Sequence, residues 1–505
     1  MFERLVSEIR KHHVFSSVWP EAEWAKDLPA LEREVLEAPE REGLLRGLCR
    51  LSNALRDGHL TFSPCTKTAR ARAGPLMLPL AFAQAGRYEA PHFIVTQVGR
   101  VSGITPGDEL LDYDGVPSDA LLEHFRFELN GAQVGVRLDQ LTELLQARYG
   151  FSQLGLAGTG VTVTARHGTG IVRETRQFAV AQPQRAASEP QNAVAQPQRA
   201  ASEPQNAVAQ PQRAAVKPAV AAAPPQRACP APSRDYAGEY ELVEVGAHVC
   251  LYRALRPPFE PYPIVRQISF LYALEDLAAD HALVQAFLAQ TQHVSGVLLD
   301  LRDNGGGKAA DHFLPWYSSV AYRGANEWVH LHGELGDRVR LRRALRSDAA
   351  VDEYLRRAAS SNGWWVRPFD CDHGDCQRAR AAALPRVSSA PVALLLGPGC
   401  RSSCDTFAAI WTREHFGPSV GTPPAAMYTS LRYPLPVSLG DEFLGDFEIA
   451  LCGLRLDDRE PWLEGRPLRL DAFVEPRWPE RSYDRLLLDA AVRALSDSER
   501  AGSSG

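Results

Sequence analysis

The sequence predicts a multidomain α/β protein, α+β overall. A chain of 505 residues with 45% hydrophobic residues is long enough for two or three domains with apolar cores. From about residue 234 to 498, short apolar runs alternate with helical patterns, which favours a largely parallel sheet covered on both faces. Two of these runs end in small residues, and they predict where the functional edge of the sheet lies.

The first run, residues 297–301, reads as a buried strand and stops before Gly305, Gly306 and Gly307. The second run, residues 392–396, is followed by a tight turn at 397–401 and a helix start at Ser402. Ligand sites in such sheets lie at the carboxyl ends of the strands. A serine at this kind of turn presents its hydroxyl beside helix N-terminal amides, which can stabilise a developing oxyanion.

Before this core the pattern changes three times. Residues 1–72 show helical spacing and predict a small helical unit that ends in the turn DGHLTF. Residues 73–178 predict short strands and turns, and the stretch 104–122, with its Pro-Gly-Asp and Asp-Gly turns, resembles a PDZ domain. An unrelated small β domain is the alternative. Residues 179–233 contain an exact 14-residue repeat rich in Pro, Gln and Ala and predict a disordered linker, and residues 499–505 predict a flexible tail after the core at 234–498.

Composition excludes several classes of function. The net charge of −6, without a basic stripe, gives no footprint for nucleic acid. The N-terminal segment MFERLVSEIRKHHVF lacks the apolar stretch of a signal peptide, and no apolar run is long enough to cross a membrane. Nine cysteines, an odd number, favour reduced thiols over a disulfide framework. We therefore expect a cytoplasmic protein that uses neither membrane nor nucleic acid.

A serine nucleophile requires a base within hydrogen-bond reach, which is itself oriented by a third group. Histidine is the best candidate by its pKa, but the chain contains 14 histidines, so composition alone does not select one. His59 stands out because it lies in the turn between a helix and a short strand. Such a histidine is also common as a surface or cap residue.

Four segments carry a family resemblance: DGHLTF, the PDZ-like stretch, DLRDNGGG and GCRSSCD occur in the order found in serine peptidases of the tricorn-core and C-terminal-processing type. That group also includes the interphotoreceptor retinoid-binding protein modules. The resemblance implies a ClpP/crotonase-like α/β catalytic core and a serine-type endopeptidase without cofactor or metal. It implies Ser402 as the nucleophile, and the backbone amides of Ser403 and of the Gly305–Gly306 turn as the oxyanion hole.

Two branches of this family differ in the residue that acts as the base, and this chain resembles the branch that uses a histidine. One branch uses a lysine beyond the serine, but Met427 stands at that position and no lysine follows Lys308. The other branch uses a histidine in a context similar to that of His59, although Gly58 replaces a serine found there in some members. A glutamate completes that arrangement, and Glu464 in WLEGRPLRLD matches it, with a solvated loop carboxylate as the alternative.

Three further alternatives stay open. A catalytically inactive relative that binds peptide or another ligand would share this fold, because fold does not fix function. Cys400 and Cys404 flank Ser402 and could supply a thiol, although Cys404 falls in the helix and is expected to pack. The segment Cys371 to Cys376 could form a metal or redox loop, but it lacks a second ligand pair, so a mobile insertion is favoured. The expected partner is a peptide or unfolded protein substrate, with a homo-oligomer left open.

Overall fold

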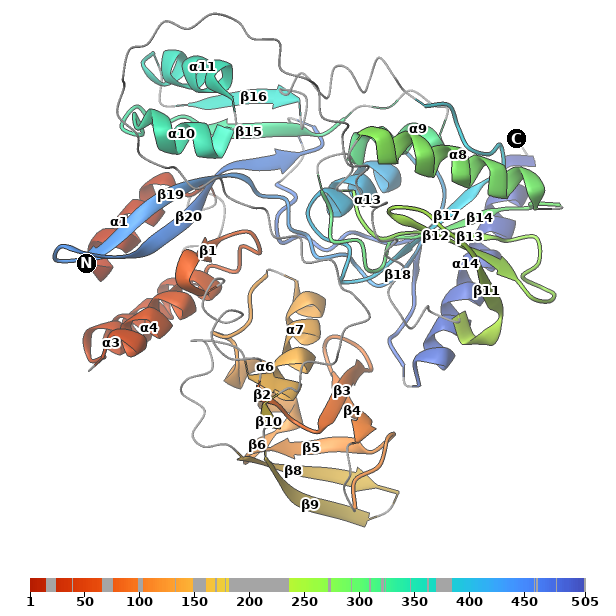
Figure 1. Cartoon of the computed structure of the whole chain (residues 1–505), viewed down its shortest axis with the longest axis horizontal. Helices are drawn as coiled ribbons and strands as arrows, with labels where there is room; N and C mark the ends of the chain where they lie inside the picture. The colour runs from red at the N-terminus through yellow and green to blue at the C-terminus, as the bar shows by residue number, and fades with distance from the viewer. Residues whose placement is uncertain are drawn as a thin grey trace, which may run out of the picture.

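A seven-stranded sheet forms the centre of the C-terminal part, in the order β11-β12-β13-β14-β17-β18-β21 (Figure 1). Its strands from β13 to β21 run parallel, while β11 and β12 add an antiparallel hairpin at one edge. The strands are β11 (Tyr240–Val245), β12 (Val249–Ala254), β13 (Ile264–Gln267), β14 (Val297–Asp300), β17 (Val392–Leu396), β18 (Ser419–Gly421) and β21 (Ala472–Phe473). The predicted multidomain α/β class is confirmed.

The computed structural model describes residues 1–14, 24–38, 40–65, 76–98, 103–131, 133–148, 160–168, 170–177, 179–180, 236–270, 274–291, 293–307, 310–318, 322, 324–345, 347–360, 363–368, 384–457, 459, 462–477 and 479–503. The predicted linker at 179–233 lies outside these residues except for β10 (Ala179–Val180), which pairs with β2 (Leu76–Met77). The segment from Cys371 to Cys376 also lies outside them.

Side-chain alternation along the parallel strands fills two separate apolar layers, since successive residues point to opposite faces. Leu299 and Leu394 lie in the layer beneath α8 (Leu274–Gln290), α9 (Ala310–Tyr317) and α13 (Ser403–Arg413). Leu298 and Leu395 lie in the opposite layer, which α14 (Glu480–Ser503) covers. Both faces of β14 and β17 are therefore buried, which explains why these strands read as continuous apolar runs.

A second sheet combines the two ends of the chain. The N-terminal strand β1 (Thr61–Phe62) pairs with β20 (Glu442–Arg455), which also pairs with β19 (Ser430–Leu439) and β15 (Asn326–His330), and β15 pairs with β16 (Trp364–Pro368). Its apolar core includes residues of α1 (Phe2–His12), α3 (Leu28–Leu36), α4 (Arg41–Ala54), α10 (Arg338–Leu345) and α11 (Asp348–Ala358). The predicted helices of residues 1–72 therefore pack on strands from the other end of the chain.

A third sheet has its own apolar core and lies at the bottom of Figure 1. It follows the order β3-β4-β5-β8-β9, with β6 on β5, and helix α7 (Val134–Gln146) lies against β3. The strands are β3 (Leu80–Ala85), β4 (His92–Val98), β5 (Glu109–Tyr113), β6 (Val116–Pro117), β8 (Gly160–His167) and β9 (Gly170–Gln177). The short helix α6 (Leu121–His124) lies between β6 and α7 in the chain, and the short β7 (Ala147–Arg148) pairs with β2. Strand β3 is the edge of this sheet nearest α7.

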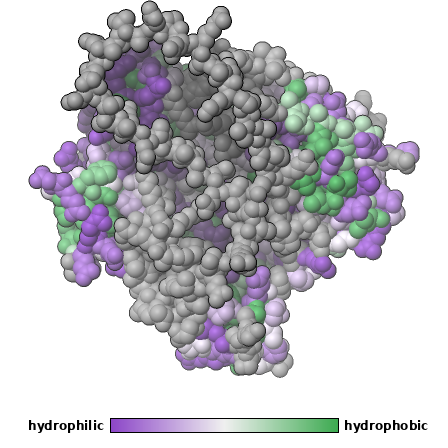
Figure 2. All heavy atoms as spheres, in the orientation of Figure 1, coloured by the Kyte–Doolittle hydropathy of each residue, from purple (hydrophilic) through white to green (hydrophobic). Residues whose placement is uncertain are grey.

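On the face that Figure 2 shows, hydrophobic residues gather at the right, with hydrophilic residues around them. Among the described residues, no helix has the length and apolar character needed to cross a membrane.

Candidate active site

The serine turn has a strained backbone. Ser402 immediately precedes α13 and adopts φ 59° and ψ −121°, while the buried strand β17 ends six residues earlier at Leu396. A residue other than glycine held in such a sparsely populated conformation costs about 1–3 kcal/mol, which the surrounding structure must offset. The Ser402 side chain makes no capping bond to the helix. A strained serine between a strand and a helix is the geometry that exposes a nucleophilic hydroxyl.

The glycine turn packs directly on this serine. A Cβ added to Gly306, which has φ +85°, would lie 2.9 Å from Ser402 Cβ and 3.0 Å from the Ser403 amide nitrogen, and nearer still to the Arg401 carbonyl oxygen. The Arg401 amide also donates to the Asn304 carbonyl at 3.0 Å. Only glycine fits so close to the serine backbone. The two small-residue segments predicted from the sequence are therefore in contact.

The amides of this turn differ in what they already bind. The Gly306 amide donates to Asn304 Oδ1 at 2.8 Å, and Asn304 Nδ2 in turn donates to the Gln267 carbonyl at 3.0 Å. Of the three donors predicted for the oxyanion hole, Gly306 therefore supplies the close packing. Gly305 and Ser403 stay the predicted amide donors, and Ser403 is the first residue of α13.

His59 lies in the turn between α4 and β1, as predicted. Its backbone amide donates to Asp57 Oδ1 at 2.9 Å, and a Cβ on Gly58 would come within 2.7 Å of Met427 Sδ. Gly58 therefore lies against the flexible Met427 side chain. Burial lowers the pKa of His59 to about 4, against the opposing charge of Asp57, and the positive charge of Arg432 lowers it further. The imidazole is thus neutral at pH 7 and able to accept a proton.

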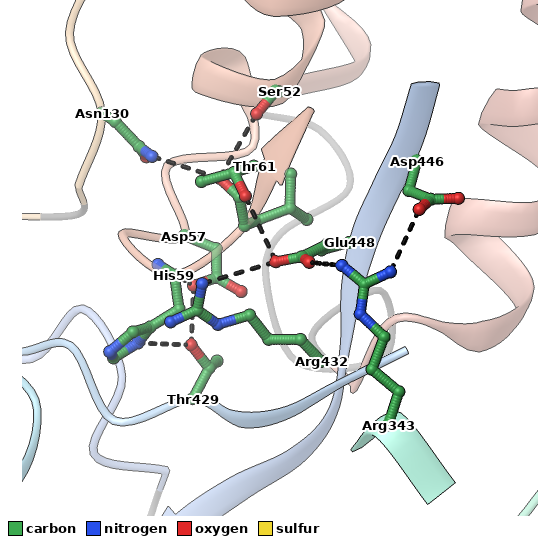
Figure 3. Close-up of polar contacts among 11 residues, drawn as sticks. Ser52, Asp57, His59, Thr61, Asn130, Arg343, Thr429, Arg432, Asp446 and Glu448 are labelled. Carbon is green, nitrogen blue, oxygen red and sulfur yellow. Dashed lines mark hydrogen bonds and ion pairs between the residues drawn. The ribbon is translucent and has the colours of Figure 1, made fainter. Parts of the chain in front are cut away.

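Thr429 and Asp57 surround the His59 ring in Figure 3. His59 Nδ1 lies 3.0 Å from Thr429 Oγ1, and the Thr429 hydroxyl donates to Asp57 Oδ1 at 2.7 Å. Asp57 is buried and also binds His13 Nε2, 3.0 Å from Oδ2. Although burial opposes it, the hydrogen bond and charge of His13 lower the pKa of Asp57 to about 2, so Asp57 is a carboxylate at neutral pH.

The sequence did not predict that Thr429, Asp57 and His13 lie around His59. Asp57 could have been found, because it lies two residues before His59 in the same turn, but no local signal marks the other two.

Glu464 is buried rather than solvated, so the surface-loop alternative is wrong. Its Oε2 accepts the Tyr428 amide at 2.5 Å, one residue before Thr429, and the Gly465 amide donates to the Ala426 carbonyl at 3.2 Å. Burial raises the pKa of Glu464 well above its ordinary value, and the negative charges of Asp57 and Asp405 add to this. The bond to Tyr428 means that Glu464 holds the backbone that carries Thr429.

Asp405 ties the start of α13 to the same loop. It is fully buried, and its two carboxylate oxygens accept the amides of Ala426, at 2.7 Å, and Met427, at 3.1 Å. Burial raises the pKa of Asp405 to about 7 in spite of these bonds. The segment 425–429 therefore connects the serine helix, through Asp405, with the histidine turn, through Met427 and Thr429.

Two disulfides that join described residues correct the expectation of reduced cysteines. Cys400 and Cys404 are bonded to each other across Ser402, and Cys49 of α4 is bonded to Cys65. Both sulfurs beside Ser402 are therefore oxidised, which removes the alternative of a thiolate nucleophile at this turn. The expectation of free thiols rested on the odd count, whereas the spacing of four residues in sequence allows this bond. Cys404 is buried, as predicted.

Within the described ranges no group of three or more His, Cys, Asp or Glu residues is arranged to hold a metal ion.

An α/β core with a strained serine beside a glycine turn, and a buried histidine that is neutral at pH 7, contains the residue types that serine hydrolases use. Residues 273–441 match the model of peptidase family S41, and this match confirms the predicted resemblance to the tricorn-core and C-terminal-processing serine peptidases. No match to a curated protein was found.

Solved structures resemble the whole chain. Mature CPAF complexed with lactacystin superposes with a TM-score of 0.59 at 13% identity, covering 98% of this chain and 98% of that chain. Mature CPAF alone gives a TM-score of 0.59 at 13% identity, covering 97% of this chain and 94% of that chain. At this level of identity the similarity concerns the fold.

Proposed function

We propose that this protein is a serine endopeptidase in which Ser402 is the nucleophile and His59 the general base. The carrying observation is the strained Ser402 turn packed on Gly306, because residues in strained backbone conformations cluster at active sites. The fold of a peptidase family around this turn supports the same function.

In the proposed mechanism, Ser402 Oγ attacks a peptide carbonyl and His59 Nε2 takes the hydroxyl proton. The amides of Gly305 and Ser403 bind the oxyanion, in the positive field at the N-terminus of α13. His59 then protonates the leaving amine. Water hydrolyses the acyl-enzyme by the same steps in reverse. Glu464 completes the proposed Ser/His/Glu arrangement, acting on His59 through the loop that carries Thr429.

A substrate-binding role is proposed for the PDZ-like unit. A cavity of about 500 Å³ is lined by Phe82 of β3, Asp139 of α7, and Gly397 and Gly399 of the serine turn, among other residues. Asp139 also pairs with Arg401, the residue before Ser402, at 2.8 Å. An extended peptide could add to the β3 edge beside this cavity. Residues 73–178 would then hold substrate away from the scissile bond.

The domain boundaries and the homo-oligomer remain predictions. Near two of these boundaries, β10 (Ala179–Val180) pairs with β2, and α14 continues to Ser503. The cytoplasmic location also remains a prediction, and the disulfides at Cys49 and Cys400 count against a reducing compartment.

A fluorophosphonate probe, which reacts with activated serines, tests the proposed function. Wild-type protein should be labelled, while Ser402→Ala should not be labelled and His59→Ala should be labelled at least about 100-fold more slowly. Absence of labelling in folded wild-type protein would favour the alternative, an inactive peptide- or ligand-binding relative. Hydrolysis of unfolded casein then separates endopeptidase activity from mere serine reactivity.

A further inference from the structure

The His59 ring is held at Nδ1, on the side opposite to Nε2, the nitrogen proposed to accept the proton. The Thr429 hydroxyl has one hydrogen, and it donates that hydrogen to Asp57 Oδ1 at 2.7 Å. Thr429 Oγ1 can therefore only accept from His59 Nδ1, 3.0 Å away, so Nδ1 must carry the ring proton. A neutral ring protonated at Nδ1 has its lone pair on Nε2, which is the nitrogen that a general base needs.

Asp57 anchors this arrangement at both of its oxygens. Oδ1 accepts the Thr429 hydroxyl and, at 2.9 Å, the His59 backbone amide, while Oδ2 lies 3.0 Å from His13 Nε2. Asp57 and His13 are both buried. A buried carboxylate requires several donors to persist as a charge, and here they come from three separate segments of the chain. Asp57, itself held by these donors, therefore fixes the direction in which the Thr429 hydroxyl points.

Glu464 occupies a different environment. Its bond to the Tyr428 amide leads to the loop backbone, and its remaining oxygen Oε1 is buried without a hydrogen-bond partner. Two acids near one histidine can be assigned different roles by their surroundings. Asp57 faces the hydroxyl that holds the ring, whereas Glu464 faces the backbone that holds that hydroxyl.

We propose that Thr429, Asp57 and His13 form a positioning chain that selects the Nδ1-protonated tautomer of His59. Among these residues, Asp57 is the acid that orients His59, through the hydroxyl of Thr429. Glu464 holds the loop that carries Thr429. The inference rests on the proposed function of His59 as the base, and it deepens that function by naming the groups that prepare it.

Nitrogen-15 NMR of the His59 ring tests the tautomer directly. The measurement uses full-length Ser402→Ala protein labelled at histidine, with His59→Gln in the same background to assign the signal. The expected spectrum shows the proton on Nδ1, and Thr429→Val should lose this preference because valine keeps the shape of threonine without the hydroxyl. A proton on Nε2 in the Ser402→Ala protein would overturn the proposal. This readout requires no activity, so it separates the inference from the proposed function.

Labelling rates with the fluorophosphonate probe supply the second readout. Thr429→Val should react about 10- to 100-fold more slowly than wild type, because a misoriented base loses rate on this scale. Thr429→Ser restores the hydroxyl and should recover most of that loss. The matched control is Thr412→Val, which removes a hydroxyl bond to the Ala408 carbonyl inside α13 and should keep the wild-type rate.

The outcomes are distinct. Equal rates for Thr429→Val and wild type would overturn the positioning chain while leaving the peptidase proposal intact. A loss in Thr429→Val that serine does not recover would mean that the loop packing matters and the hydroxyl does not, which also overturns it. Unlabelled wild-type protein with the expected Nδ1 proton would instead count against the proposed function alone.

Discussion

Substituting Gly306 by alanine should disable the serine turn without unfolding the core. The new Cβ would lie 2.9 Å from Ser402 Cβ and 3.0 Å from the Ser403 amide, and closer to the Arg401 carbonyl. Backbone cannot yield as a flexible side chain does, so we expect the serine turn and the glycine turn to separate by roughly 0.5–1 Å. A displacement of about 1 Å in a catalytic group lowers the rate by about 100-fold, equivalent to about 2.7 kcal/mol of activation free energy.

A second contribution has to be removed by a control. Gly306 has φ +85°, where an alanine costs about 1–2 kcal/mol of folding free energy regardless of its neighbours. Gly115, in the turn between β5 and β6, has φ +86°, and a Cβ there would meet no atom within 4 Å. Gly115→Ala therefore carries the same backbone strain without the collision.

The assay compares the fluorophosphonate labelling rate of the two variants with their stability toward urea. Both should lose about 1–2 kcal/mol of stability, and only Gly306→Ala should lose labelling, by about 100-fold. If Gly306→Ala reacted at the wild-type rate, the close packing of Gly306 against Ser402 would be wrong. If Gly115→Ala lost as much labelling as Gly306→Ala, the effect would come from general instability.

Four other predictions concern the site. The pKa of His59 is about 4, below its ordinary value, so the neutral form that acts as a base persists at acid pH. Labelling should therefore stay level from pH 8 to about pH 5 and fall with a midpoint near 4. A midpoint near 6.5 would contradict the buried environment of His59. The unfolded chain takes up this proton at higher pH, so the stability that neutral His59 contributes is present above about pH 6.5 and lost as pH falls toward 4, as acid titration of urea unfolding should show. Replacing both Cys400 and Cys404 by serine removes the bond across the serine turn; it should cost up to about 2 kcal/mol and slow labelling, and an unchanged rate would show that the turn holds its shape unaided. Asp405→Ala leaves the amides of two loop residues without their acceptor, so it should cost about 2–4 kcal/mol in urea unfolding and slow labelling, while a variant as stable as wild type would contradict the role of Asp405 in holding the loop.

Local pattern was sufficient for the strands and helices around the site. The run at 392–396 forms β17 with the same bounds, because a strand buried on both faces must be apolar at every position. The helical patterns predicted within residues 234–498 include α14, whose apolar face covers the sheet. The contact between the serine and glycine turns also followed from the sequence, since adjacent parallel strands end at one edge of the sheet.

The disulfides and the surroundings of His59 did not follow from the sequence. The cysteine count gives no information about which sulfurs approach each other, and the odd number favoured free thiols. Thr429 and His13 lie far apart in sequence, and they reach the His59 turn because β1 pairs with β20 and α1 packs on the same sheet. No periodicity records such pairings, which depend on how whole elements pack.

The sequence by itself determined the two turns, their residue types and the family that they resemble, because glycine and serine at the ends of buried strands are constrained by local geometry. Only the tertiary structure decided how the histidine is prepared. A neutral ring with its proton on Nδ1 depends on burial, on the direction of one threonine hydroxyl and on a buried aspartate, and these are brought together from three distant segments of the chain.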